Sequence, residues 1–223
     1  MALTKSRGNM YSFITHTWNA IKGICFHDCS YCYMKKFDAL LPVRIDIKEL
    51  NVNLGNGNFI FVGSGTDMWA FDIPSDWITQ VLDYCNLFDN RYLFQSKDPE
   101  RFVKFIGHPV MKKSVLCTTI ETNRFYPSIV MNAPKAEERA YAMYKLAKLG
   151  MNNYVTCEPL MKFDLPEMME LIKMCSPVQV NIGRNSRKDI SLPEPTKNEV
   201  QALITELRRF TKVEIKSNAQ CWI

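Results

Sequence analysis

Three cysteines stand within one segment of eight residues. They are Cys25, Cys29 and Cys32, spaced as C-x3-C-x2-C. A segment this short keeps the three sulfur atoms within a few ångströms, so the thiolates can converge on one metal centre. The first twenty residues contain no apolar block typical of a signal peptide. In a chain that is not secreted, metal binding or redox chemistry is favoured over disulfides.

Other interpretations of this motif are open at this stage. Intervals of four and three also suit one face of a buried helix, although Gly23, Asp28 and Ser30 make the segment a poor helix. A structural zinc site needs four ligands, usually as two pairs, and His27 or a distant cysteine could supply the fourth. An electron-transfer iron–sulfur protein would use a fourth cysteine in a characteristic run, which the sequence lacks. Three ligands leave one metal position open, as a catalytic centre requires.

With Tyr31 before the third cysteine, the motif resembles the signature of the radical S-adenosylmethionine (radical SAM) enzymes. The resemblance implies that the three cysteines hold three irons of a 4Fe–4S cluster and that S-adenosylmethionine chelates the fourth. An external electron donor would reduce the cluster, and the resulting 5′-deoxyadenosyl radical would abstract a hydrogen from a substrate. Tyr31 matches the aromatic position that relatives place beside the adenine. Trp18, Asn19, Gly23 and Tyr33 resemble a phage and prophage branch, distantly similar to spore photoproduct lyase.

From residue 58 onward, short β-rich runs alternate with segments of helical period, which is typical of βαβ units around a parallel sheet. The expected strands are 11–17, 58–63, 92–95, 114–119, 153–157, 178–182 and 212–215. The expected helices are 75–88, 99–107, 136–149, 166–175 and 200–210. A closed barrel of eight units needs about 250 residues, and the chain has 223. We therefore predict an α/β fold, a partial (β/α)6 TIM-type barrel over residues 11–216, within one domain of residues 1–223.

Polar groups follow nearly every expected strand, and the carboxyl ends of the strands carry the chemistry of such barrels. The candidates besides the cysteines are Gly63, Ser64, Gly65, Thr66, Asp67, Lys97, Glu121, Asn123 and Glu158. Loops are polar in general, so ordinary solvent-exposed loops are the alternative explanation of this pattern.

The resemblance gives these positions cofactor-binding roles. The turn Gly63–Asp67 stands where relatives bind the amino group of S-adenosylmethionine, although it departs from their usual Gly-Gly-Glu form. Lys97 resembles a lysine that pairs with the carboxylate of that ligand. Glu121 and Asn123 are expected to hold its ribose hydroxyls or its amino acid end. Glu158 completes the set, with substrate anchor, general base and structural ion pair as open roles.

The five other cysteines are dispersed, and we expect them to pack as small apolar side chains. They are Cys85, Cys117, Cys157, Cys175 and Cys221. For Cys117 and Cys157, both in expected interior strands, the alternative is a thiol that donates a hydrogen atom to a product radical.

The charge balance, 28 Lys+Arg against 23 Asp+Glu, allows an anionic partner. Together with the phage-like resemblance it suggests modification or rearrangement of a DNA base, such as a substituted thymine, flipped out of its stack. The alternatives are a small metabolite or peptide substrate, and a non-catalytic zinc-stabilised nucleic-acid-binding module. No apolar run approaches the ~20 residues of a membrane span, so we expect a cytoplasmic protein, in the host cytoplasm if phage-encoded, with no membrane partner.

Overall fold

The architecture is a curved, mostly parallel sheet covered by helices on one face. The computed structural model describes residues 3–37 and 41–223. In spatial order the sheet contains β1 (Thr4–Lys5), β2 (His16–Trp18), β5 (Phe59–Val62), β6 (Arg91–Ser96), β7 (Ser114–Thr119), β8 (Asn152–Cys157), β9 (Gln179–Ile182) and β10 (Lys212–Ile215). β1 pairs antiparallel with β2, and all other neighbours pair in parallel. A small second sheet joins β3 (Ile21–Lys22) to β4 (Arg44–Ile45). The predicted α/β partial barrel is confirmed.

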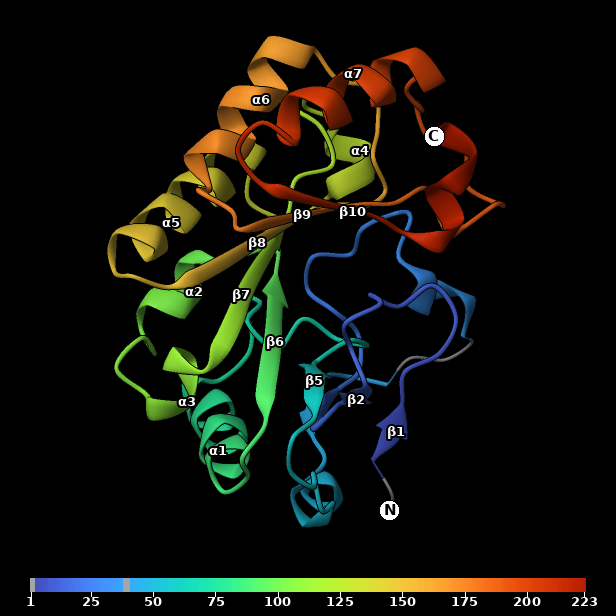
Figure 1. Ribbon diagram of the computed structural model, residues 1–223. Helices are drawn as coiled ribbons and strands as arrows, with labels where there is room; N and C mark the ends of the chain where they lie inside the picture. Colours follow the sequence, from blue (N-terminus) through green and yellow to red (C-terminus); the bar gives the residue numbers. More distant parts are fainter. Residues whose placement is uncertain (1–2, 38–40) are drawn as a thin grey trace.

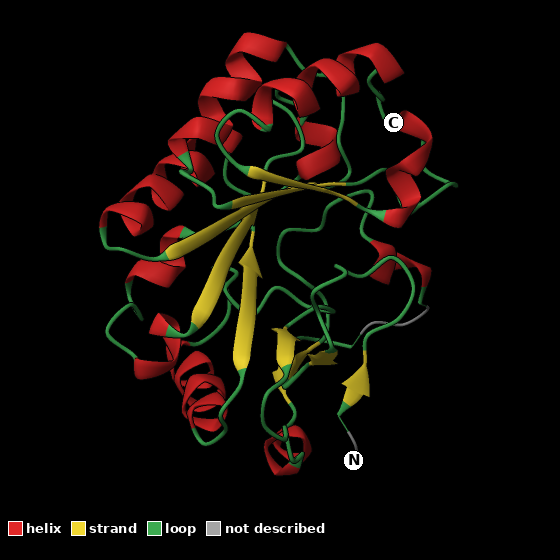
Figure 2. Cartoon of the chain, viewed as in Figure 1, coloured by secondary structure: helices red, strands yellow, loops and turns green. Residues whose placement is uncertain are grey.

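Helices cover the outer face of the sheet, and loops fill its open side. The α-helices are α1 (Ser75–Asn86), α2 (Glu100–Val103), α3 (Pro109–Lys112), α4 (Pro127–Val130), α5 (Ala136–Lys148), α6 (Leu165–Met174) and α7 (Lys197–Leu207). The 3-10 helices are η1 (Tyr33–Lys36), η2 (Ile47–Asn51) and η3 (Ser217–Trp222). The longer helices line the convex side, while the N-terminal segment, in blue, lies across the concave side (Figure 1). Most of the chain on the concave side is loop (Figure 2).

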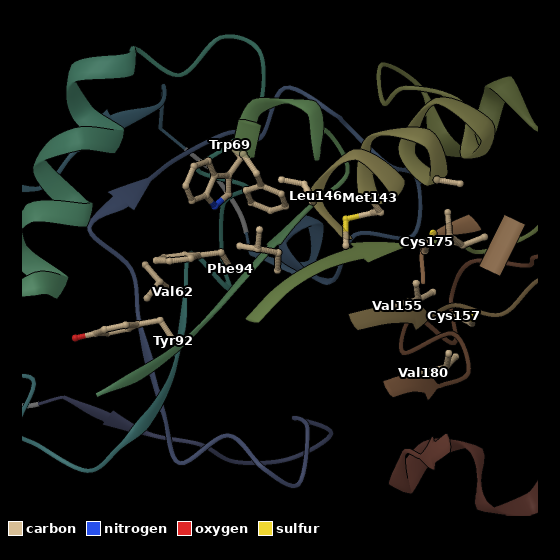
Figure 3. Close-up of a cluster of buried hydrophobic side chains, with 14 of the residues drawn as sticks. Val62, Trp69, Tyr92, Phe94, Met143, Leu146, Val155, Cys157, Cys175 and Val180 are labelled. Atoms are coloured by element: carbon tan, nitrogen blue, oxygen red, sulfur yellow. The ribbon is translucent and has the colours of Figure 1, made fainter. Parts of the chain in front are cut away.

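Alternating side chains of each strand enter two separate apolar layers, as the two-residue period of a strand requires. Ile60 and Val62 of β5 pack in the large layer under the helices. Phe59 and Phe61 pack instead in a small layer on the concave side, where Tyr11 of the N-terminal segment joins them. Part of the large layer appears in Figure 3, with Cys157 and Cys175 among its apolar side chains.

Four of the five dispersed cysteines are buried, so their predicted packing role is confirmed for Cys85, Cys117, Cys157 and Cys175. The prediction is wrong for Cys221, which is exposed. Its sulfur lies 3.3 Å from a guanidinium nitrogen of Arg184.

The segment after β1 contacts the segment after β10 across the open side of the partial barrel. Asn9 follows β1 and its Oδ1 accepts hydrogen bonds from the Ser217 hydroxyl at 3.0 Å and from the backbone N–H of Asn218 at 3.3 Å. Both partners follow β10, the opposite edge of the sheet. These bonds place residues from both edge strands in one wall, close to the carboxyl ends of the strands.

Two expected elements differ from the structure. The strand expected over 11–17 is shortened to β2, because residues 11–14 form a turn in which the backbone N–H of Ile14 bonds the carbonyl of Tyr11 at 3.0 Å. The helix expected over 99–107 ends after one turn, and a second short helix follows at Pro109. Among the helices in the described part of the chain, none combines the length and the apolar character that spanning a bilayer requires.

Candidate active site at the carboxyl ends of the strands

The three clustered cysteines lie on one irregular loop and line one cavity of about 600 Å³. The loop is a succession of turns: the backbone N–H of Asp28 bonds the Cys25 carbonyl at 3.2 Å, and that of Cys32 bonds the Cys29 carbonyl at 3.1 Å. Helix η1 begins only after Cys32. The alternative of a buried helix face is therefore wrong, and all three cysteines are free thiols.

A segment distant in sequence holds this loop from outside. The backbone N–H of Ser30 donates to the carbonyl of Ile129 in α4 at 2.9 Å. Asn132, just after α4, uses its backbone N–H to bond the His27 carbonyl at 3.2 Å and its side-chain amide to bond the Phe26 carbonyl at 3.0 Å. We call residues 129–132 the clamp segment, because its contacts fix the backbone of the cysteine loop.

The thiols sit in surroundings that suit a metal cluster. Burial raises the pKa of Cys25 to about 12, with a further contribution from the Asp67 carboxylate, while the backbone N–H groups of Asp67 and His27 point at the sulfur. Burial also raises the pKa of Cys29. A metal cation displaces the thiol protons when it binds. N–H groups directed at thiolate sulfur are typical of iron–sulfur sites.

The three thiols line one cavity together. Within residues 3–37 and 41–223, no group of three or more His, Cys, Asp or Glu side chains is arranged to hold a single metal ion.

The turn Gly63–Asp67 closes the cavity beside the cysteine loop, and its polar groups are largely bonded within the protein. Gly63 has a φ of +80°, a conformation that L side chains rarely adopt, and a Cβ there would lie 3.2 Å from the Thr66 carbonyl. The N–H of Gly65 donates to the side-chain oxygen of Asn19 at 2.9 Å. The hydroxyl of Thr66 donates to the carbonyl of Gly23 at 2.8 Å.

Asp67 is a structural carboxylate rather than a free acceptor. Its Oδ2 lies 2.9 Å from His27 Nε2, from the Ser96 hydroxyl and from the backbone nitrogen of Lys97. Its Oδ1 accepts from the backbone N–H of Trp69 at 2.9 Å. Burial opposes ionisation, but these donors outweigh it and lower the pKa of Asp67. The carboxylate ties the turn after β5 to the end of β6.

Glu121 forms the centre of a buried charged network behind the cavity. The side chain is fully buried, and Arg139 of α5 donates to its Oε2 at 2.8 Å. Its Oε1 accepts from Lys97 Nζ and from the Tyr31 hydroxyl. Burial alone would raise the pKa of Glu121, but Arg139 and Lys97 hold it at about 2. Lys97 Nζ lies 5.2 Å from the centre of the Tyr31 ring, so the network fixes two residues that do line the cavity.

The structure separates some predicted site residues from the cavity. Among the residues that the structure describes, most predicted site residues line the cavity: the three cysteines, Tyr31, Gly63, Ser64, Gly65, Asp67, Lys97 and Glu158. Thr66, Glu121 and Asn123 do not. Asn123 instead exchanges two hydrogen bonds with Asp164, at 2.8 and 3.1 Å. Glu121 is turned toward its cations and Thr66 toward the backbone of Gly23. Site residues in such barrels follow the carboxyl ends of the strands, and we call this the strand-end rule. The rule finds all three positions but does not tell which way each side chain turns.

The wall opposite the cysteine loop contains residues that sequence reasoning missed. Lys216, directly after β10, pairs with Glu158 at 2.5 Å and lines the cavity with Asn9 and Tyr11. The strand-end rule applied to the last expected strand would have found Lys216. Asn9 carried no such signal, because it comes before the first parallel strand and reaches the site through the contact between the segments after β1 and β10.

Comparisons with known proteins give matches only to solved structures. No family model and no curated protein sequence matches the chain. A mutant of spore photoproduct lyase in which one cysteine is replaced by serine superimposes with a TM-score of 0.68 and 12% identity, over 95% of this chain and 79% of that one. A double mutant of the same enzyme, with bound AdoMet and dinucleoside spore photoproduct, gives 0.70 and 12%, over 96% and 80%. SuiB from Streptococcus suis bound to S-adenosylmethionine gives 0.56 and 10%, over 89% and 49%.

Spore photoproduct lyase and SuiB are both radical SAM enzymes, and the likeness extends over nearly the whole of this chain. The cysteine loop lies at the carboxyl ends of the strands, where a barrel of this kind carries its chemistry. The chain has the fold of the radical SAM enzymes.

Proposed function

We propose that the protein is a radical SAM enzyme whose Cys25, Cys29 and Cys32 hold a 4Fe–4S cluster with one iron open to S-adenosylmethionine. The observation that carries the proposal is that three free thiols of one loop line a single cavity at the carboxyl ends of the strands. The cavity, about 600 Å³, is within the ~300–1,000 Å³ range of small-molecule and cofactor sites. When bound and reduced, the group supplies a 5′-deoxyadenosyl radical that abstracts hydrogen.

The residues around the cysteine loop would bind and orient S-adenosylmethionine. The ammonium of Lys97 has three donors and gives one to Glu121, so others are left for the ligand carboxylate. Because the Asp67 oxygens are already bonded, the ligand ammonium would be met by backbone carbonyls of the turn Gly63–Asp67. The Tyr31 ring, held by Glu121, offers a flat surface at the cavity wall.

A base in DNA, whose backbone phosphates are anionic, suits the charges around the cavity. Among the residues that the structure describes, six basic side chains line it against three acidic ones. The basic residues are Arg7, Lys35, Lys36, Lys97, Arg184 and Lys216, and the acidic ones are Asp28, Asp67 and Glu158. Phosphates are attracted by such an excess of cations, which would guide a flipped base toward the radical. We propose an external electron donor as a further partner and the cytoplasm, of the host if phage-encoded, as the compartment.

Anaerobic turnover tests the proposal. The reduced, reconstituted protein is mixed with S-adenosylmethionine and oligonucleotides carrying deuterated thymidine or a substituted thymidine, and 5′-deoxyadenosine is analysed by mass spectrometry. We expect 5′-deoxyadenosine to form and to carry deuterium from the substrate. Formation without deuterium from any oligonucleotide, but with deuterium from a peptide or small metabolite, would contradict the DNA substrate. No 5′-deoxyadenosine at all would contradict the enzyme.

A further inference from the structure

An ion pair lies in the cavity wall opposite the cysteine loop. Lys216 Nζ is 2.5 Å from Glu158 Oε2, and the side chains are only 8% and 15% exposed. Both residues line the cavity. Enclosed ion pairs are expensive to desolvate, and an apolar pair would often serve packing equally well. A pair that faces a cavity is therefore a candidate for recognising a ligand.

The carboxylate of Glu158 is held in place from its other side. Its Oε1 accepts from the side-chain amides of Asn9 at 2.7 Å and Asn218 at 3.1 Å. Gly183 leaves the space that the side chain needs, because a Cβ there would lie 2.7 Å from Glu158 Cδ. The Oε1 side of the carboxylate is thus occupied by protein, and Oε2, beside Lys216, remains for a ligand.

The ammonium of Lys216 is fixed as well. It lies 4.4 Å from the centre of the Tyr11 ring, a favourable distance for a cation–π contact. The Tyr11 hydroxyl is in turn anchored, 2.7 Å from Gln95 Oε1 and 2.8 Å from the Thr156 hydroxyl. Within the described residues, Glu158 is the hydrogen-bond acceptor of this ammonium, which has three donors. Spare donors and a spare acceptor therefore lie side by side in a rigid wall.

We infer that Glu158 and Lys216 form a subsite that reads a cis-amide edge, in which a ring N–H stands beside a C=O. The N–H would donate to Glu158 Oε2, and the carbonyl would accept from Lys216 Nζ. Thymine and guanine present such an edge. Cytosine also places a donor beside an acceptor, but its acceptor is a ring nitrogen, which an ammonium binds less well than a carbonyl oxygen. The inference deepens the proposed function and rests on its nucleic-acid substrate.

Binding of short oligonucleotides to the reconstituted, unaltered protein tests the subsite. Each oligonucleotide carries one base between abasic residues: thymine, N3-methylthymine, guanine, N1-methylguanine or cytosine. Fluorescence anisotropy gives the affinities. We expect thymine, guanine or both to bind about tenfold more tightly than their N-methylated forms and than cytosine, the scale of one paired hydrogen-bonding contact to a base. The base that binds more tightly, thymine or guanine, is the one that the subsite reads.

Equal binding of methylated and unmethylated bases would overturn the subsite, as would cytosine binding as tightly as the others, or no binding at all.

A variant adds a second measurement. Lys216→Met should abolish the preference over the methylated base, whereas Lys36→Met, which removes an exposed cation of the same cavity, should weaken both oligonucleotides alike. Thermal unfolding checks that both variants fold. Because binding is measured without turnover, loss of 5′-deoxyadenosine formation would affect the proposed function and leave this result standing.

Discussion

At the scale of single residues, Glu121 shows how a residue near a site can act without reaching it. Its carboxylate is fully buried and is neutralised by Arg139 and Lys97. The same carboxylate holds the hydroxyl of Tyr31. Glu121 thus holds Tyr31 and Lys97 at the cavity wall and is not in the cavity lining, whereas the resemblance implied contact with the ribose hydroxyls or the amino acid end of S-adenosylmethionine.

Replacing Glu121 by glutamine should destabilise the protein strongly. Glu121→Gln leaves the buried Arg139 and the partly buried Lys97 without their counter-charge, and breaking a buried pair in this way costs about 3–5 kcal/mol. Urea unfolding followed by circular dichroism gives the free energy of unfolding. The matched control is Glu194→Gln, which breaks the half-exposed pair with Arg184 and should cost less than about 1 kcal/mol. Similar losses for both variants would contradict the account of Glu121.

The low pKa of Glu121 also predicts how stability depends on pH. The folded-state pKa is about 2, below the ordinary value of 4.5. The stabilisation is therefore complete above about pH 4.5 and is lost as the pH falls toward 2, and the difference corresponds to about 3 kcal/mol. The free energy of unfolding of the native protein should fall more steeply between pH 5 and pH 3 than that of Glu121→Gln. Parallel pH profiles would show that Glu121 does not titrate in this way.

Single residues differ in how far the sequence predicts them. The spacing of Cys25, Cys29 and Cys32 sufficed to predict that they lie together, because the loop that carries them is short, and all three line one cavity. The direction of Asn123 could not be predicted, since its partner Asp164 comes from a different strand end. Lys216 carried the same strand-end signal as Lys97, but its ion pair with Glu158 depends on how β8 and β10 are placed in the sheet.

At the scale of elements, the clamp segment makes long-range contacts that local sequence patterns do not predict. The helix expected over 200–210 is present as α7, which begins with a capping box: the N–H of Glu199 donates to the Thr196 hydroxyl and the N–H of Thr196 to the Glu199 carboxylate. The short α4 had no such periodic signal. Its contacts with the cysteine loop join residues about 100 positions apart, such as Ser30 and Ile129, which only the folded topology brings together.

Weakening the clamp segment should loosen the cysteine loop. Asn132→Ala removes the side-chain bond to the Phe26 carbonyl, next to Cys25. We expect a reconstituted cluster to be lost several-fold faster to an iron chelator, measured by the decay of its visible absorbance, while the free energy of unfolding changes by about 1 kcal/mol or less. Asn51→Ala is the control, because it removes an equivalent exposed bond, to the Ile47 carbonyl, within η2 and outside the cavity lining. Equal rates of loss in the two variants would contradict a role for the clamp segment.

At the scale of the whole molecule, the fold places two walls around the cavity that the proposed function assigns to cofactor and substrate. The cysteine loop forms one wall, and residues after β1 and β10, Asn9 and Lys216 among them, form the other. Chain length and the alternation of strands and helices were enough to predict a partial barrel. The contact between the segments after β1 and β10 could not be predicted, because it depends on side chains more than 200 positions apart, such as Asn9 and Ser217.

The iron content of anaerobically reconstituted cysteine variants tests the central claim most directly. We expect the unaltered protein to hold about four irons per chain, the content of one 4Fe–4S cluster. Replacing Cys25, Cys29 or Cys32 by alanine should each remove most of that iron, whereas the control Cys221→Ala, at an exposed thiol outside the loop, should retain it. A colourless protein that binds one zinc ion, or iron that persists in all three loop variants, would contradict the claim.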